Sequence, residues 1–170
     1  MDEVILVNEK DEETGTMEKL EAHLQGKLHR AFSIFLINNK GEWLLQKRAN
    51  SKYHSAGLWT NACCSHPLPG EDIYPAALRR LNEEMGITCH FKHAFSFIYK
   101  TRFDNDLTEH EYDHVFTGVF EGDPVINKDE VSAWRYLSVK KIQYELVADT
   151  ASFSYWFQIA LPRVLTFLYG

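Results

Sequence analysis

The sequence predicts an α+β fold, a layered α/β/α sandwich with a mixed sheet flanked by helices. Strand-like segments are interspersed with helical ones, without the regular β-α-β order of a purely parallel sheet. Hydrophobic residues make up 45% of the 170 residues and aromatic residues 14%, which is enough for a packed core. One core serves a chain of this length, so we expect a single domain spanning residues 1–170.

The N-terminal segment is predicted to contain a strand and a short helix. Val4–Asn8 forms the strand, and Gly15 signals a turn. A charged helical stretch then runs from Glu18 towards Gln25. Gly26 ends it, because glycine readily adopts the left-handed conformation of a helix C-terminus.

A hairpin and a longer helix are predicted in the middle of the chain. The apolar runs Ala31–Asn38 and Trp43–Gln46 flank Asn38–Gly41, whose residues tolerate the positive φ of a hairpin turn. Apolar residues recur every four positions over Ile73–Met85, and Gly86 stands where a glycine commonly ends a helix.

The C-terminal half is predicted to add three strands and two helices. The strands are expected at Cys89–Tyr99, Glu111–Phe120 and Val131–Leu137, with the polar loop Arg102–Thr108 between the first two. Ser138 caps a helix that runs towards Val147. Phe153–Tyr169 forms an aromatic closing helix, in which Pro162 is expected to cause a kink or a break.

The composition excludes several classes of ligand and location. The longest apolar stretches fall far short of the roughly 20 residues that a bilayer crossing requires, so no membrane span is expected. The start of the sequence is acidic, unlike a secretion signal, and we expect a cytoplasmic protein. A formal net charge of -6 disfavours nucleic acid, so a polyanionic ligand is expected to be small and held by local basic residues or by metal.

The segment Thr60–Pro67, TNACCSHP, concentrates reactive and conformationally restricted residues in a short stretch, which is typical of a functional loop. Cys63 and Cys64 are adjacent and the chain has a third cysteine, Cys89, which favours reduced thiols over disulfides. The alternative is that the two adjacent cysteines are only small buried apolar residues. Their position in the fold decides between these interpretations.

Five residues carry donor atoms suited to a borderline divalent cation: His23, His29, His66, Glu109 and Glu111. On one continuous helix His23 and His29 would point in different directions, so shared ligation requires a chain bend at Gly26. Glu109 and Glu111 project from the same face of a strand. The alternative for these carboxylates is a solvated surface row, since carboxylates usually stay hydrated.

A second set of residues suits an anion. Lys47, Arg48 and Lys52 lie close together in sequence, and with Lys19 and Arg80 they have enough charge to neutralise a diphosphate in an acidic protein. The alternative is that the arginines of this helix only form surface ion pairs, Arg79 with Glu83 and Arg80 with Glu84, each four positions apart.

The segment after the cysteine motif partly resembles the Nudix box. Its glutamate, arginine, apolar, paired-glutamate and glycine positions correspond to Glu71, Arg79, Leu81, Glu83, Glu84, Gly86 and Ile87. Ser65 occupies the position of the opening glycine, and Arg80 replaces the glutamate that follows the arginine. Because hydrolases of that family use this glutamate for metal, the departure argues against Nudix hydrolysis.

From Val4 to Trp156 the sequence resembles type 1 isopentenyl-diphosphate isomerase, a Nudix-fold enzyme. TNACCSHP matches its cysteine motif, and Glu109-His110-Glu111 matches its paired glutamates. The resemblance implies a Nudix-like fold and a divalent metal, in this family manganese, zinc or magnesium, held by His23, His29, His66, Glu109 and Glu111. It also implies that Glu84 helps to bind a magnesium ion on the substrate diphosphate, which is contacted by Lys19, Arg48, Lys52 and Arg80.

The reaction implied by the resemblance interconverts isopentenyl and dimethylallyl diphosphate. Glu111, aided by Tyr99, adds a proton to one carbon, and Cys64 removes a proton from another in the forward direction. Trp156 matches the tryptophan that stabilises the carbocation-like intermediate. The expected partner is a small diphosphate, neither nucleic acid nor membrane, and the oligomeric state stays open.

Two other functions stand as alternatives. One is a Nudix-type diphosphohydrolase, against which Arg80 argues. The other is a non-catalytic, metal-stabilised binding module, against which Cys64 argues if it faces a separate acid.

Overall fold

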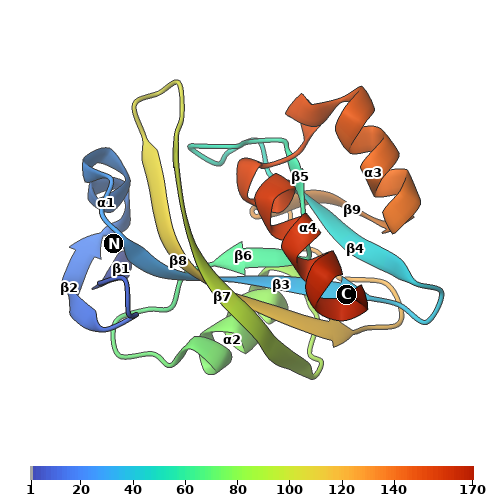
Figure 1. Ribbon diagram of the computed structural model, residues 1–170, viewed down its shortest axis with the longest axis horizontal. Helices are drawn as coiled ribbons and strands as arrows, with labels where there is room; N and C mark the ends of the chain where they lie inside the picture. The colour runs from blue at the N-terminus through green and yellow to red at the C-terminus, as the bar shows by residue number, and fades with distance from the viewer. Residues whose placement is uncertain (1) are drawn as a thin grey trace.

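A computed structural model describes residues 2–170, which form a mixed β-sheet with helices on both faces (Figure 1). The strands are β1 (Glu3–Val7), β2 (Glu13–Glu18), β3 (His29–Ile37), β4 (Glu42–Arg48), β5 (Trp59–Thr60), β6 (Cys63–Ser65), β7 (Phe91–Arg102), β8 (Thr108–Val119) and β9 (Val131–Ser138). The helices are α1 (Lys19–Gln25), α2 (Ile73–Met85), α3 (Val139–Ala148) and α4 (Tyr155–Tyr169), with a 3-10 turn at Thr150–Ser152.

Strand β3 lies at the centre of the sheet. It pairs in parallel with β8, from His29 opposite Glu111 to Ile37 opposite Val119, and antiparallel with β1, β4 and β6. The pairs β1–β2, β4–β5, β4–β9 and β7–β8 are antiparallel. The parallel β3–β8 pair therefore makes the sheet mixed, as the sequence predicts.

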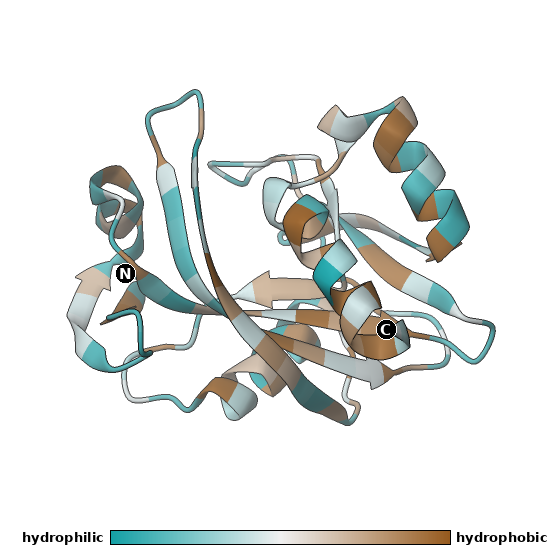
Figure 2. Cartoon of the chain, in the orientation of Figure 1, coloured by the Kyte–Doolittle hydropathy of each residue, from teal (hydrophilic) through white to brown (hydrophobic). Residues whose placement is uncertain are grey.

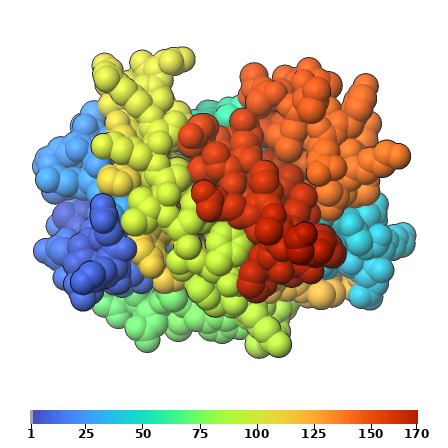
Figure 3. Space-filling view, in the orientation of Figure 1, coloured from blue at the N-terminus to red at the C-terminus, as the bar shows by residue number. Residues whose placement is uncertain are grey.

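Side chains alternate across β3 into two cores. Phe32, Ile34 and Leu36 pack with α2, whereas Phe35 and Ile37 join the core beneath α3 and α4. Hydrophobic residues are concentrated along the centre of the sheet and in α4 (Figure 2). On the face shown in Figure 3, the hairpin of β7 and β8 lies beside α4. The predicted layered sandwich is therefore confirmed.

The predicted hairpin between β3 and β4 is confirmed only close to its turn. Ile37 pairs with Trp43, and the side-chain oxygen of Asn38 accepts two backbone N–H groups of the turn. Beyond this point the two strands diverge, and β6 pairs with β3 instead. The TNACCSHP segment is thereby drawn into the sheet, with Cys64 opposite Ser33.

Several strands differ from the prediction. Gly15 is not in a turn but pairs opposite Leu6 within β2, a largely exposed strand that has no apolar alternation to reveal it. Strands β5 and β6 were not predicted, because two or three residues are too few to show a period. Strand β8 begins at Thr108 rather than Glu111, so that both Glu109 and Glu111 lie within it.

The helices follow the prediction, with an adjustment in α4. This helix begins two residues later than expected, because Ser154 caps it by accepting the N–H of Phe157. Pro162 does not break the helix, since the burial of Leu161 and Val164 holds this turn against the core. In the described part of the chain, no helix has the length and apolarity to cross a membrane.

Gly86 is expected to tolerate alanine less well than Gly41. Both have positive φ, 64° and 76°, so a Cβ costs about 1–2 kcal/mol at either position. At Gly86 the Cβ would also lie 2.5 Å from the carbonyl oxygen of Val125, whereas at Gly41 no atom of residues 2–170 lies within 4 Å. Gly86→Ala should therefore lower the free energy of unfolding by at least ~1 kcal/mol more than Gly41→Ala. Urea denaturation followed by circular dichroism measures both losses, and equal losses would contradict the clash.

Candidate active site

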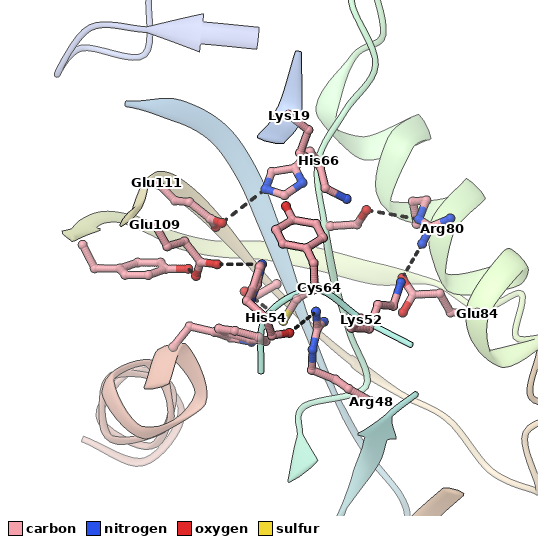
Figure 4. Close-up of a pocket in the computed structure, with 15 residues that line it drawn as sticks. Lys19, Arg48, Lys52, His54, Cys64, His66, Arg80, Glu84, Glu109 and Glu111 are labelled. Carbon is pink, nitrogen blue, oxygen red and sulfur yellow. Dashed lines mark hydrogen bonds and ion pairs between the residues drawn. The ribbon is translucent and has the colours of Figure 1, made fainter. Parts of the chain in front are cut away.

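One pocket collects side chains from α1, α2, α4 and several strands (Figure 4). The predicted site residues that line it are Lys19, Arg48, Lys52, Cys64, His66, Arg80, Glu84, Tyr99, Glu109, Glu111 and Trp156. The two others, His23 and His29, adjoin Glu109 and Glu111, at 4.0 and 3.7 Å between imidazole Nε2 and carboxylate oxygen. The tertiary structure thus brings all the predicted site residues together.

Three imidazoles meet beside the pocket. The ring centroids of His23 and His29 are 5.1 Å apart, and the ring of His66 lies 4.9 Å from His29 and 6.1 Å from His23. Gly26 has φ 65° and turns the chain between α1 and β3, which supplies the bend that shared ligation requires. One donor atom from each imidazole and one oxygen of Glu111 all lie within 4.8 Å of one another.

The free nitrogens of two imidazoles are suited to bind a metal ion. His23 Nδ1 lies 2.7 Å from the carbonyl oxygen of Lys19, and His29 Nδ1 lies 2.8 Å from that of Lys27. Because a carbonyl only accepts, Nδ1 donates in each ring and Nε2 carries the lone pair. Both Nε2 atoms are buried, and neither has a hydrogen-bond partner within residues 2–170. This group of histidine and glutamate side chains can therefore hold a divalent ion.

The carboxylates of β8 are buried rather than solvated. Glu109 and Glu111 share one face of the strand and are only 2% and 7% exposed, which excludes a hydrated surface row. The hydroxyl of Tyr99 donates to Glu109 Oε1. Burial, with the adjacent charge of Glu111, raises the pKa of Glu109. Burial also opposes ionisation of Glu111, but His29 and His66 hold the pKa of Glu111 below its usual range.

The two adjacent cysteines have different surroundings. Cys64 lines the pocket, where its thiol donates to Asn61 Oδ1 at 3.0 Å and lies 3.5 Å from Ser33 Oγ. Burial raises the pKa of the Cys64 thiol. Cys63 points to the opposite side of β6, packs in the core beneath α2 and donates to Glu84 Oε2 at 3.3 Å. Strand alternation therefore gives Cys63 a structural place and leaves Cys64 accessible to a ligand.

Positive charge is concentrated across the pocket from the paired glutamates (Figure 4). Arg80 donates to Ser65 Oγ and to Glu84 Oε2, both at 3.1 Å, and Lys52 pairs with Glu130. Glu84 is only 4% exposed, so its pair with Arg80 is not a surface ion pair. Arg79 and Glu83 do form the surface pair of the alternative interpretation, at 3.2 Å with the Glu83 side chain 43% exposed. Burial and the nearby charge of Lys52 lower the pKa of Lys19, as expected where cations are crowded together.

Trp156 closes the pocket from the first turn of α4. The side chain is buried, and the guanidinium of Arg48 lies 5.1 Å from the ring centre. Its indole Nε1 is buried without a partner in residues 2–170. An aromatic surface therefore adjoins both the basic and the acidic residues of the pocket.

The sequence patterns did not reveal several pocket residues. Ser33, Tyr53 and His54 also line the pocket. Ser33 donates a hydrogen bond at 2.8 Å to Asp113, which continues the row of carboxylates on β8 as its spacing predicts. His54 Nε2 lies 3.6 Å from a carboxylate oxygen of Glu109. Burial and the charge of Arg48 lower the pKa of His54 to about 2. A further histidine close to Lys52 was the only signal in the sequence, and it belongs to no motif.

Comparisons with known proteins identify the family. The NUDIX domain profile matches residues 27–157. A Pectobacterium atrosepticum protein named isopentenyl-diphosphate Delta-isomerase is 48% identical over 95% of this chain and 90% of its own length. A Photorhabdus laumondii protein, isopentenyl-diphosphate Delta-isomerase 2, is 50% identical over 93% of this chain and 90% of its own length. The chain belongs to the isopentenyl-diphosphate Delta-isomerase family of NUDIX-domain proteins.

Solved structures with a similar fold are more distant in sequence. A Deinococcus radiodurans crystal structure aligns with a TM-score of 0.78 at 20% identity, covering 93% of this chain and 96% of that one. A MutT protein from Methanosarcina mazei aligns with a TM-score of 0.66 at 22% identity, covering 80% and 91%. At these identities the likeness concerns the fold alone, and it agrees with the layered sandwich described above.

The NUDIX-box helix of this isomerase-family chain presents a cation to the pocket. Arg80 stands where the box has a glutamate, and it pairs there with Glu84 while also approaching Glu130 at 3.4 Å. The box therefore has a cation rather than a carboxylate at this position.

Divalent metal is expected to stabilise the folded chain. The buried imidazole nitrogens are brought together only in the native state, so a metal ion binds the folded chain in preference to the unfolded one. Zn²⁺ at about 100 times its Kd therefore adds ~2.7 kcal/mol to the free energy of unfolding. For a chain of this size the melting temperature should rise by roughly 5–10 °C in a fluorimetric scan, and EDTA should reverse the rise. His29→Ala should reduce the shift, whereas exposed His90→Ala should keep it in full. An undiminished shift in His29→Ala would exclude these imidazoles as the binding site.

Proposed function

We propose that this chain is an isopentenyl-diphosphate Delta-isomerase that interconverts isopentenyl and dimethylallyl diphosphate, acting as one domain over residues 1–170. Family membership supports the activity, since relatives with this name are about half identical over nearly the whole chain. One observation carries the conclusion: the thiol of Cys64, the carboxyl of Glu111 and four basic side chains line one pocket. Double-bond migration in a diphosphate requires two proton-transfer groups beside an anion site.

The two proton transfers are assigned to Glu111 and Cys64. Glu111 adds a proton to the terminal alkene carbon, and Cys64 takes a proton from the carbon nearer the diphosphate, so that the electron pair of that C–H bond forms the new double bond. The reverse reaction exchanges the two roles. We assign Tyr99 to assist the proton transfer by Glu111 indirectly. The Tyr99 hydroxyl donates a hydrogen bond to Glu109, the neighbour of Glu111 on β8. Burial raises the pKa of Cys64, and the thiolate of a weaker acid is a stronger base for a C–H proton.

Trp156 is assigned to the positive charge that develops between the two transfers. A tertiary carbocation needs a partner that attracts positive charge without being readily alkylated. The face of an indole provides this, and a desolvated cation–π contact contributes about 2 kcal/mol. The burial of Trp156 and of both β8 glutamates supports the proposal, because water that reached the cation would quench it.

The basic residues and the metal ligands complete the assignment. We assign Lys19, Arg48, Lys52 and Arg80 to the diphosphate, and Glu84 to a magnesium ion that accompanies it. The resident manganese, zinc or magnesium ion is assigned to His23, His29, His66, Glu109 and Glu111. When bound, this ion would orient Glu111 and strengthen its carboxyl as an acid. The proposed partner is a small diphosphate rather than nucleic acid or a membrane, and the proposed location is the cytoplasm.

The two alternatives have less support. A diphosphohydrolase of the NUDIX type requires carboxylates along the box helix. Arg80 occupies one of those positions and forms an ion pair with Glu84. A binding module requires no reactive thiol, yet Cys64 lines the pocket together with Glu111. Double-bond isomerisation uses both features.

One assay separates the three functions. The metal-loaded protein is incubated with isopentenyl diphosphate in deuterated water, and the products are examined by NMR. An isomerase yields deuterated dimethylallyl diphosphate. Release of phosphate without movement of the double bond would instead identify a hydrolase, and recovery of unchanged substrate would identify a binding module.

Cys64→Ala should reduce turnover by at least about 100-fold, because a positioned acid or base commonly contributes that much. Metal content should stay unchanged. Cys89→Ala is the matched control, since this thiol is not among the residues that line the pocket in the described chain. Full activity in Cys64→Ala would remove the thiol from the proposed reaction.

A further inference from the structure

A second group of donor atoms lies beside the cluster of three imidazoles. His54 follows β4 and directs its Nε2 towards Glu109 Oε2, at 3.6 Å, and His23 Nε2 lies 4.0 Å from the same oxygen. One donor atom from each of these three residues lies within 4.8 Å of the other two. Two ligand atoms bound to one ion, each with a bond near 2.1 Å, stand roughly 3 to 3.5 Å from each other. The nitrogen–oxygen distances measured here are close to that separation and are longer than hydrogen bonds.

In His23 and Glu109, the atoms that face this position are the ones that make no other hydrogen bond in the described residues. Glu109 Oε1 accepts the hydroxyl of Tyr99, which leaves Oε2 for a further partner. His23 Nδ1 is engaged by the carbonyl of Lys19, which leaves the buried Nε2 without a partner in residues 2–170. A nitrogen lone pair and a carboxylate oxygen therefore converge on the side of Glu109 where His54 lies.

The ring of His54 is held in place by aromatic neighbours. It stacks on Phe103 with ring centroids 5.2 Å apart, and Trp156 meets it edge-on at 6.0 Å. Tyr53 packs against a further edge at 4.8 Å. Only 8% of the side chain is exposed. A ligand whose rotation is already restricted loses little conformational entropy on binding, as a metal site requires.

The hydrogen bonds of His54 do not account for this orientation. Its Nδ1 lies 3.4 Å from Ser55 Oγ, which is a long contact, and its backbone carbonyl accepts from Arg48 at 3.3 Å. Neither contact requires Nε2 to face Glu109. A histidine that served only to fill space would not need this nitrogen opposite a buried carboxylate.

We propose that His54 is a metal ligand of this chain, forming with His23 and Glu109 a cation position that shares His23 with the first cluster. The inference rests on the metal site of the proposed isomerase and adds a residue to it. One Nε2 lone pair binds one ion, so the two positions are alternatives for His23. Two imidazoles and one carboxylate suit Zn²⁺ or Co²⁺ better than Mg²⁺, and three protein ligands leave a coordination position open.

Metal binding without substrate tests the assignment. The metal-free full chain is titrated with Zn²⁺ against a chromophoric chelator, and with Co²⁺ by visible absorption. Because the two positions compete for His23, the effect is measured in the His29→Ala background, where adding His54→Ala should abolish tight Zn²⁺ binding, a loss of at least tenfold in affinity, and shift the Co²⁺ bands through the loss of a nitrogen ligand. His54→Gln keeps the size of the side chain without the imidazole and should behave alike, and circular dichroism verifies the fold of both. His90→Ala, an exposed histidine, should leave both signals unchanged.

A double substitution separates the two positions. His29→Ala weakens the first cluster, so the second should still bind one Zn²⁺ per chain, and adding His54→Ala should abolish that binding. Unchanged Zn²⁺ affinity and Co²⁺ spectra when His54→Ala or His54→Gln is added to His29→Ala would overturn the assignment. Because no substrate is present, the outcome is independent of the isomerase assay. If the wild-type chain isomerises the substrate but metal binding does not depend on His54, this inference alone is rejected and the proposed function stands.

Discussion

Buried polar atoms that the chain itself does not satisfy are the constraint on which the pocket depends. Within residues 2–170, His23 Nε2 and His29 Nε2 have no partner, and leaving a buried polar atom unpaired costs about 1–3 kcal/mol. Two buried carboxylates lie beside them, and repulsion between Glu109 and Glu111 adds to that cost. A divalent cation satisfies the nitrogens and offsets the repulsion, so the stability of this region is coupled to metal binding.

The register between β3 and β8 delivers these groups to one place. His29 stands opposite Glu111 in the parallel ladder, and the same ladder continues into the two cores. Val115 packs beneath α4 and Phe116 packs beneath α2, so a slip of one residue would bury neither correctly. Such a slip would also turn both glutamates to the opposite face. The hydrophobic cores therefore determine the geometry of the pocket.

Charge is separated across the pocket in a way that suits an anionic ligand with an uncharged tail. Glu109 and Glu111 occupy one side, and Arg80 with Glu84 occupies the other (Figure 4). The basic side chains form a local positive region in a chain whose formal net charge is -6. Cys64 and Trp156, which carry no charge, line the same pocket.

The sequence by itself determined the features that depend on local chemistry. Glycines at positions 26 and 86 marked helix ends, because only glycine readily accepts the backbone conformation found there. Periodicity identified α2 and the longer strands. The TNACCSHP motif and the spaced glutamates indicated Cys64, His66, Glu109 and Glu111, since side-chain chemistry is visible without coordinates. Tyr99 and Trp156 were indicated only by the family resemblance.

Only the tertiary structure decided which of these side chains meet. The pairing of β6 with β3 joins segments distant in sequence, and its three residues leave no period to detect, so neither the opposite directions of Cys63 and Cys64 nor the contact with Ser33 was predictable. The approach of His54 to Glu109 likewise follows from loop packing against Phe103 and Trp156. Burial and distance are properties of non-local contacts, and no local pattern encodes them.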